Sequence, residues 1–241
     1  MIAMLAESPE WEWDLLFCMF LIGIGLILAP FVGRWADARA RLIAGWAKYE
    51  RLSYHRRRHQ IPERFAFRAL SRGSHQHQYA RNRVSGNYHG WMIEAFDYTY
   101  NASAFNQIVT RTSTRHLGAV IVQSPVPLAP LYIRPQGSFD GLGKMVGIED
   151  IDFELAAFNQ RFFVQASDKK WAFDVIHQDT MELLMDYGSD FSIEFNGYGA
   201  IIWRDQWMDP DEYRHALALL TGVLSRLPEY VIQRRVTPEF L

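Results

Sequence analysis

Cysteine and recognisable catalytic motifs are nearly absent from this sequence. Its single cysteine, Cys18, excludes an internal disulfide framework and any metal site built from several cysteines. Eight tryptophans and sixteen phenylalanines among 241 residues exclude a disordered chain, and this length suits one or two folded domains. The formal net charge of -2 argues neither for nor against a nucleic-acid partner. The composition therefore predicts a folded protein without naming a reaction.

Sequence motifs that are typical of enzymes are also missing. The stretch GLGKMVG at 141–147 is no phosphate-binding loop, because Ser138 and Met145 stand where that loop needs glycine and a hydroxyl residue. His75 and His77 could share one side of a strand, but no acidic or cysteine residue stands near them to complete a metal site. The chain has no Gly-x-Ser-x-Gly motif. We therefore expect no enzyme activity, no catalytic residue, no metal and no cofactor.

A long apolar run is the most prominent feature that is present. From Leu15 to Gly33, nineteen residues carry no charge, which is close to the roughly twenty that a helix needs to cross a bilayer. Trp11, Trp13 and Trp35 flank the run, where aromatic residues anchor membrane helices at the interface. The acidic leader AESPEWEWD differs from a signal peptide, which begins with positive charge. The pattern predicts a transmembrane helix with three interface anchors; a buried helix of a soluble domain is the alternative.

The charges on either side of the run predict its orientation. Four acidic residues precede it, whereas arginines follow it, and the positive-inside rule places basic flanks in the cytoplasm. We therefore expect a single-pass protein of the bacterial inner (cytoplasmic) membrane. Its N-terminus would lie outside and its C-terminal domain in the cytoplasm.

Small residues recur along the apolar run at helical spacing. Cys18, Gly25, Ala29 and Gly33 are separated by seven, four and four positions, so they fall on one side of a helix. Small side chains at this spacing let a second helix approach closely, and we expect a packed partner helix here. Glycine and alanine are also common in membrane helices generally, and Pro30 could simply mark a kink. No histidine precedes His55, so the run offers no imidazole to haem or chlorophyll.

Positive charge is concentrated just after the run. Residues 34–83 contain thirteen basic and three acidic residues, a local charge of about +10 in a chain whose net charge is -2. We expect a basic contact patch formed by Arg34, Arg39, Arg41, Arg56, Arg57 and Arg58. Its partner would be an acidic protein surface, other membrane-protein subunits in particular, or anionic lipid headgroups. A nucleic-acid partner is not expected, because no recognition motif accompanies the charge.

The remaining chain predicts an α+β domain built on an antiparallel sheet with flanking helices. Residues 34–60 have the composition of a helix, and aromatic and β-branched runs with turn signals at SGN and HG predict strands from residue 81 onward. A strand should end at the proline-rich PVPLAP, and further short strands are expected in LYIRP, RFFVQAS, FSIEF and YGAIIWR. Helices are expected at about 168–187 and 209–227, the second capped by Asp209 with Pro210 in its first turn.

Three segments of this domain resemble an uncharacterised bacterial family of membrane-anchored domains of unknown function. They are GNYHGWMIEAFDYTY, PLYIRPQG and ELAAFNQRFFVQASDKKWAFDVIHQDTMELLMD. The resemblance covers about residues 84–232 and implies the same layout of a membrane segment, a basic linker and a strand-rich domain. It implies no activity and brings no functional residues with it.

These observations lead to one expected organisation and one leading hypothesis. The expected parts are an external N-terminus (1–14), a transmembrane helix (15–33), a basic juxtamembrane helix and linker (34–83), and a cytoplasmic α+β domain (84–241). The leading hypothesis is a non-catalytic, membrane-anchored accessory or assembly subunit of a larger inner-membrane complex, for which an energy-transducing (photosynthetic or respiratory) complex is our guess. The alternatives are a freestanding membrane-tethered adaptor that recruits a soluble partner, and an unrecognised enzyme.

Overall fold

The computed structural model describes residues 10–59, 66–72, 78–106, 109–137, 151–230 and 232. Within these ranges it describes all side chains except those of residues 10–13, 16, 25–33, 103–106 and 109–112. The chain divides into two units, Met1–Leu42 and Ile43–Leu241. The division falls inside the first helix, so that the last turns of this helix belong to the second unit.

The first helix, α1 (Glu10–Tyr49), is 40 residues long. It ends earlier than the expected 34–60 helix because Arg51 adopts a left-handed conformation, with φ of 58°. This conformation lets the Leu52 N–H reach back to the Ala47 carbonyl at 2.8 Å, which satisfies a carbonyl at the helix end. The chain then turns into strand β1 (Ser53–His55).

The prediction of a transmembrane helix over residues 15–33 is wrong. No helix among the described residues is both long enough and apolar enough to cross a membrane. Four further predictions depended on that span and are wrong with it. They are the single-pass topology, the external N-terminus, the cytoplasmic domain and the inner-membrane location. The sequence delimits an uncharged run, whereas the structure places this run inside a longer helix whose later turns carry Arg34, Asp37, Arg39 and Arg41. The limits of an apolar run are therefore not the limits of the helix that contains it.

The three tryptophans lose their expected role as membrane-interface anchors for the same reason. The side chains of Trp11 and Trp13 lie outside the described set. That of Trp35 is 56% exposed.

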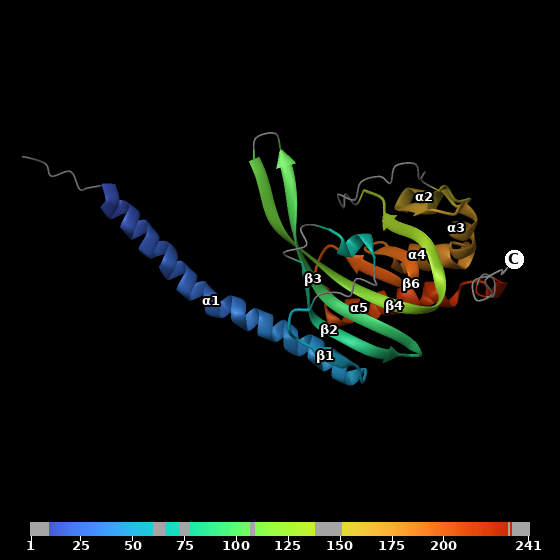
Figure 1. Ribbon diagram of the computed structural model, residues 1–241, viewed down its shortest axis with the longest axis horizontal. Coiled ribbons are helices and arrows are strands. Elements are labelled where there is room, and N and C mark those ends of the chain that lie inside the picture. Colours follow the sequence, from blue (N-terminus) through green and yellow to red (C-terminus); the bar gives the residue numbers. More distant parts are fainter. Residues whose placement is uncertain are drawn as a thin grey trace, which may run out of the picture. The chain divides into compact units, whose positions relative to one another are not determined.

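The second unit is built on an antiparallel sheet, which confirms the expected α+β class. Strands β2 (Tyr79–Tyr88), β3 (Trp91–Asn106), β4 (Val109–Pro135) and β5 (Phe162–Ala166) follow β1 in the order β1-β2-β3-β4-β5. Strand β6 (Ser192–Arg204) pairs with β4 outside this path. Figure 1 shows β4 running through the domain, first beside β3 and then, in its yellow-green half, beside β5.

The length of β4 corrects the expectation that PVPLAP ends a strand. The 27-residue strand continues through this stretch, but its register with β6 shifts between Gln123 and Leu128 and again between Leu128 and Leu131. Proline cannot donate to a regular ladder, and irregular positions tolerate it. The prolines of PVPLAP therefore interrupt the pairing without ending the strand.

The expected turn at HG is confirmed and the one at SGN is wrong. His89 and Gly90 both have positive φ, of 48° and 91°, as a two-residue turn between twisted strands requires. The Gly90 N–H is further held by the Asn87 side chain at 2.9 Å. In contrast, Gly86 lies within β2 and pairs with Ile93.

The remaining helices of the second unit alternate with its last two strands. They are α2 (Ala156–Arg161), α3 (Lys169–Val175), α4 (Gln178–Tyr187) and α5 (Pro210–Ser225), so the expected 168–187 helix is two helices. The cap of α5 is confirmed: the Asp209 side chain accepts the Glu212 N–H, and the Glu212 side chain accepts the Asp209 N–H, each at 2.8 Å.

Two hydrophobic clusters stabilise the unit. The larger one joins the end of α1, through Ile43 and Trp46, to the sheet and to α5. The smaller one is rich in aromatic residues, including Phe96, Tyr98 and Trp203, and also contains Phe67, Ala69 and Leu70 from the 3-10 helix η1 (Arg68–Leu70) and its neighbour. Neighbouring β3 residues contribute to different clusters, as expected for a strand with both faces covered.

Candidate interaction surface

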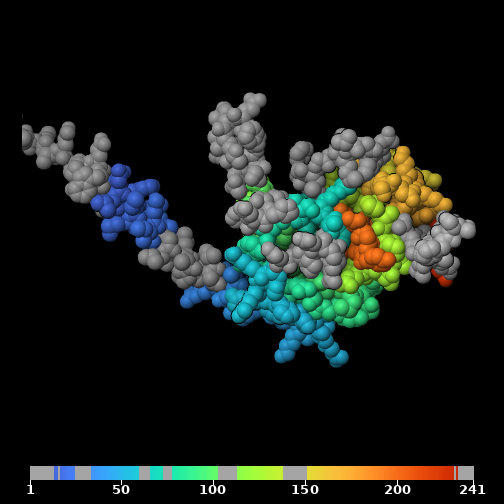
Figure 2. All heavy atoms as spheres, in the orientation of Figure 1, coloured from blue at the N-terminus to red at the C-terminus, as the bar shows by residue number. Residues whose placement is uncertain are grey.

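Arginine and histidine side chains gather where the chain leaves β1. Strand β1 pairs with β2, and this pairing places His55 opposite Arg83. Four residues later the chain returns to β2: His59 pairs with Ala80 through two backbone hydrogen bonds of 2.8 and 2.9 Å. We call the resulting cluster the basic edge; it consists of His55, Arg56, Arg57, Arg58, His59, Arg81 and Arg83. In Figure 2 the light-blue and cyan part of the chain forms the lower margin of the domain, and side chains project from it.

Two guanidinium groups of the basic edge share one aromatic ring. The guanidinium carbon of Arg58 lies 4.2 Å from the centroid of the Tyr79 ring, and that of Arg81 lies 5.6 Å from it. The negative face of an aromatic ring attracts a cation, and this attraction fixes the direction of both long side chains. The charges of the basic edge are therefore partly ordered before any partner binds.

Two nitrogen atoms of the basic edge are buried without a hydrogen-bond partner. They are the Nε2 atom of His59 and the Nε atom of Arg81. Burial lowers the pKa of His59, and the positive charges of Arg83 and His55 lower it further. A positive charge on His59 is therefore disfavoured in this environment.

Arg83 has a strong acidic partner among the described residues of the domain. Its Nε and terminal nitrogen lie 3.1 and 3.0 Å from the two oxygens of Glu94, a buried side chain on β3. This bidentate pair ties β2 to β3 and neutralises one charge of the cluster. His55, Arg57 and Arg58 remain exposed.

The six arginines of the expected basic contact patch are divided between the two units. Arg34, Arg39 and Arg41 belong to the first unit, whereas Arg56, Arg57 and Arg58 belong to the second. Arg34, Arg41 and the three second-unit arginines are exposed, and Arg39 is half-buried. Arg81 and Arg83 were not named as members of the patch, and neither were His55 and His59, although HRRRH at 55–59 contains both histidines. The alternation of arginine in RNR at 81–83 was the local signal for Arg81 and Arg83, whose neighbours in the cluster come from another part of the chain.

The first unit exposes a second kind of surface. Between Leu15 and Ile24, seven large apolar side chains of α1 are solvent-exposed, six of them by more than half: Leu15, Phe17, Met19, Phe20, Leu21, Ile22 and Ile24. Because they follow one another almost without interruption, they cover all sides of this part of the helix. Of the four expected helix-packing residues, Cys18 is exposed among them, and the side chains of Gly25, Ala29 and Gly33 lie outside the described set.

Buried carboxylates elsewhere in the domain are engaged in structural contacts. Asp97 accepts hydrogen bonds from Asn82 at 2.8 Å and from the Tyr213 hydroxyl at 2.9 Å. Glu194 accepts the Arg68 N–H at 2.9 Å and thereby holds η1 against β6. Burial raises the pKa of Glu194 to about 7, against the opposing influence of the Arg68 charge.

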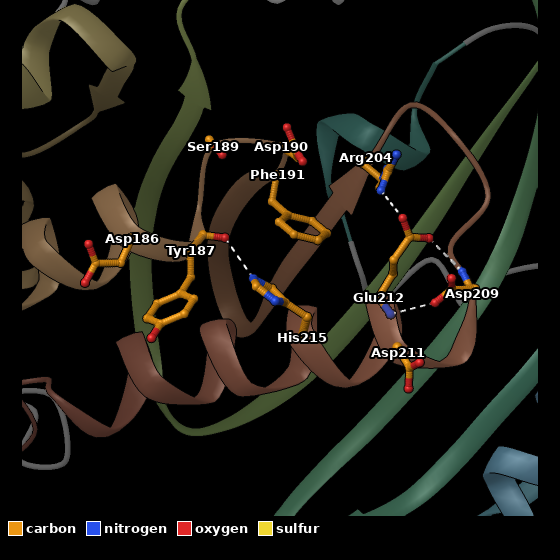
Figure 3. A pocket seen from close by; sticks show the side chains of 10 residues that line it. All are labelled: Asp186, Tyr187, Ser189, Asp190, Phe191, Arg204, Asp209, Asp211, Glu212 and His215. Atoms are coloured by element: carbon orange, nitrogen blue, oxygen red, sulfur yellow. Dashed lines mark hydrogen bonds and ion pairs between the residues drawn. The ribbon is translucent and has the colours of Figure 1, made fainter.

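A shallow depression of about 360 Å³ lies between the end of α4 and the start of α5 (Figure 3). Its aromatic wall is the His215 ring, stacked on Phe191 at 5.6 Å, while the His215 Nε2 contacts the Tyr187 carbonyl at 2.9 Å. Its acidic groups on α5 have other contacts: Glu212 pairs with Arg204, and Asp211 pairs with Arg214. No group of three or more metal-ligating side chains occurs in the part of the chain that the structure describes. The depression therefore shows no arrangement that specifies a reaction.

Comparison with known proteins gives a likeness of fold. No family model matches the chain, and no curated protein matches it. A solved structure, the crystal structure of the mycobacterial trehalose monomycolate transport factor A, is similar with a TM-score of 0.57 and 13% sequence identity. The similarity covers 78% of this chain and 96% of that one. At this identity the likeness establishes the fold alone.

Proposed function

We propose that this protein is a non-catalytic accessory subunit of a larger protein assembly. It stabilises the assembly by packing α1 against an apolar helix of a partner subunit and by contacts of its α+β domain with partner proteins. The exposed apolar surface of α1 between Leu15 and Ile24 carries this proposal.

A helix that is apolar on all sides is normally enclosed by other structure. Exposed apolar patches of this kind mark binding surfaces, because each large side chain gains about 1.5–3 kcal/mol when it leaves water. The small residues Cys18, Gly25, Ala29 and Gly33 recur at helical spacing in the sequence and suit close approach of a second helix. An apolar partner helix is therefore the occupant that we propose for α1.

The basic edge supports the same role from the second unit. Its exposed side chains His55, Arg56, Arg57 and Arg58 suit an acidic protein surface. A protein with two such surfaces can hold neighbouring subunits together without chemistry of its own.

Two kinds of host assembly are candidates. An energy-transducing complex is a guess that no feature of the sequence supports directly. The similar mycobacterial structure is named a transport factor, which makes an assembly that moves a substrate the second candidate. Fold likeness at 13% identity does not carry that protein's cargo to this chain.

Affinity capture of the full chain under mild conditions tests the proposal. We expect fixed-stoichiometry recovery with the same partner subunits in one particle on a native gel. The alternative, a freestanding adaptor, predicts a substoichiometric partner that dissociates during size-exclusion chromatography. Recovery of the chain alone would contradict both roles.

A further inference from the structure

We propose that the basic edge binds an acidic segment of a partner protein, one that presents several Asp or Glu carboxylates in succession. This inference rests on the proposed accessory role. It names the chemistry of the partner that binds the basic edge, which is one of the two proposed interaction surfaces of this protein.

The placement of like charges is the first argument. The guanidinium groups of Arg58 and Arg81 share the ring of Tyr79, so two full positive charges lie close together. Two like charges held close together repel each other. An arrangement that brings cations together is stabilised when an anionic partner inserts negative charge among them.

The distribution of charge favours a chain of carboxylates over one compact anion. Five consecutive residues, 55–59, carry an imidazole or a guanidinium group, and Arg81 adds a further charge from β2. A single phosphate contacts two or three of these groups, whereas an acidic segment running along the edge pairs with most of them. Each exposed pair contributes at most about 1 kcal/mol, so binding depends on making several pairs together.

The decisive experiment measures binding of a fluorescent peptide of alternating Asp and Glu to the purified full-length chain. We expect saturable binding that weakens steeply with salt, because exposed charges are screened. The double variant Arg57→Glu/Arg58→Glu should lose about tenfold or more in affinity, which corresponds to about 1.4 kcal/mol. The control Lys169→Glu/Lys170→Glu, at the start of α3, makes the same change in net charge and should bind nearly as well as the native chain. Thermal unfolding of both variants checks that they remain folded.

A second readout separates direct contact from a general charge effect. The pKa of His59 is lowered partly by its cationic neighbours, so a bound carboxylate should raise it, and NMR titration of the histidine ring with and without peptide measures the change. His177, on another part of the domain, serves as the internal control and should not respond.

Four results would overturn the proposal: no binding of the peptide, equal loss of affinity in the control variant, an unchanged pKa of His59, or displacement of the peptide by inorganic phosphate at equal ionic strength. Stronger Arg57- and Arg58-dependent binding to vesicles of phosphatidylglycerol and phosphatidylcholine than to the peptide would also overturn it in favour of lipid headgroups. Because the purified chain is used, failure here is distinguishable from failure of the accessory role, which depends on co-purification.

Discussion

The Tyr213 hydroxyl donates a 2.9 Å hydrogen bond to the carboxylate of Asp97, and both side chains are buried. Tyr213 belongs to α5 and Asp97 to β3, so this contact fixes the helix to the middle of the sheet. The ring of Tyr213 also stacks on Trp46, with centroids 5.3 Å apart. The end of α1, the sheet and α5 are therefore joined through one residue.

Removing the Tyr213 hydroxyl should destabilise the domain while leaving the stacked ring in place. We expect Tyr213→Phe to lower the free energy of unfolding by about 1–3 kcal/mol, because a buried carboxylate loses a donor. Urea denaturation measures the change. Tyr187→Phe, at an exposed tyrosine, is the control and should change stability by less than about 0.5 kcal/mol. Equal effects in the two variants would show that the contact with Asp97 contributes no stability.

Gly118 on β4 should not tolerate a side chain. A Cβ atom added there would lie 2.6 Å from the Met208 Cγ and 2.9 Å from its backbone nitrogen. We expect Gly118→Ala to destabilise the domain by about 1–3 kcal/mol or more, because overpacking displaces the backbone. Gly45→Ala on α1, where a Cβ meets nothing within 4 Å, is the matched control. It should be neutral or stabilising by up to about 1 kcal/mol. Equal melting temperatures for the two variants would refute the close approach.

Glu194 should make stability depend on pH near neutrality. Burial raises its pKa from 4.5 to about 7 in the folded protein, so the folded state binds this proton more tightly than the unfolded state does. The resulting stabilisation is complete below about pH 4.5, declines as the pH rises toward 7, and is absent above that value.

Glu194→Gln should remove this part of the pH dependence. We expect the difference in unfolding free energy between the native protein and the variant to favour the native protein most at low pH, and to shift toward the variant between about pH 4.5 and 7. Chemical denaturation at several pH values measures this difference. A difference that does not change over the interval would show that Glu194 titrates as an ordinary surface carboxyl.

The Asp209 cap should contribute measurably to α5. Asp209→Ala removes the acceptor for the Glu212 N–H and should cost about 1 kcal/mol of stability. Asp190→Ala, at an exposed aspartate outside any helix, is the control. If both substitutions had the same effect on urea denaturation, loss of negative charge rather than of the cap would be responsible.

Local signals in the sequence predicted several of these elements. The cap at Asp209 with Pro210, the turn at His89 and Gly90, and the antiparallel α+β class were all predicted, because each depends on residues close together in the chain. The continuation of β4 past Pro125 could not be predicted, because it depends on pairing with β6, about seventy residues later in the chain.

The interaction surfaces were predicted less well than the fold. Arg57 and Arg58 were named from their charge, but the contribution of Arg81 depends on a strand pairing that local sequence does not encode. The predicted membrane span over Leu15–Gly33 was wrong, because no helix among the described residues is both long enough and apolar enough to cross a membrane. Glu194 gave no signal at all, since its raised pKa depends on burial beside Arg68 in the folded chain.

The central claim is that the protein is an accessory subunit held in its assembly through α1. Its most direct test is quantitative co-purification of Phe17→Ser/Phe20→Ser compared with Met92→Ser, which alters an exposed apolar side chain of β3. Our account predicts that the first variant loses most of its partner subunits while its α+β domain stays folded, and that the second retains them at the native ratio. Full retention of the partners by the Phe17/Phe20 variant would contradict the account.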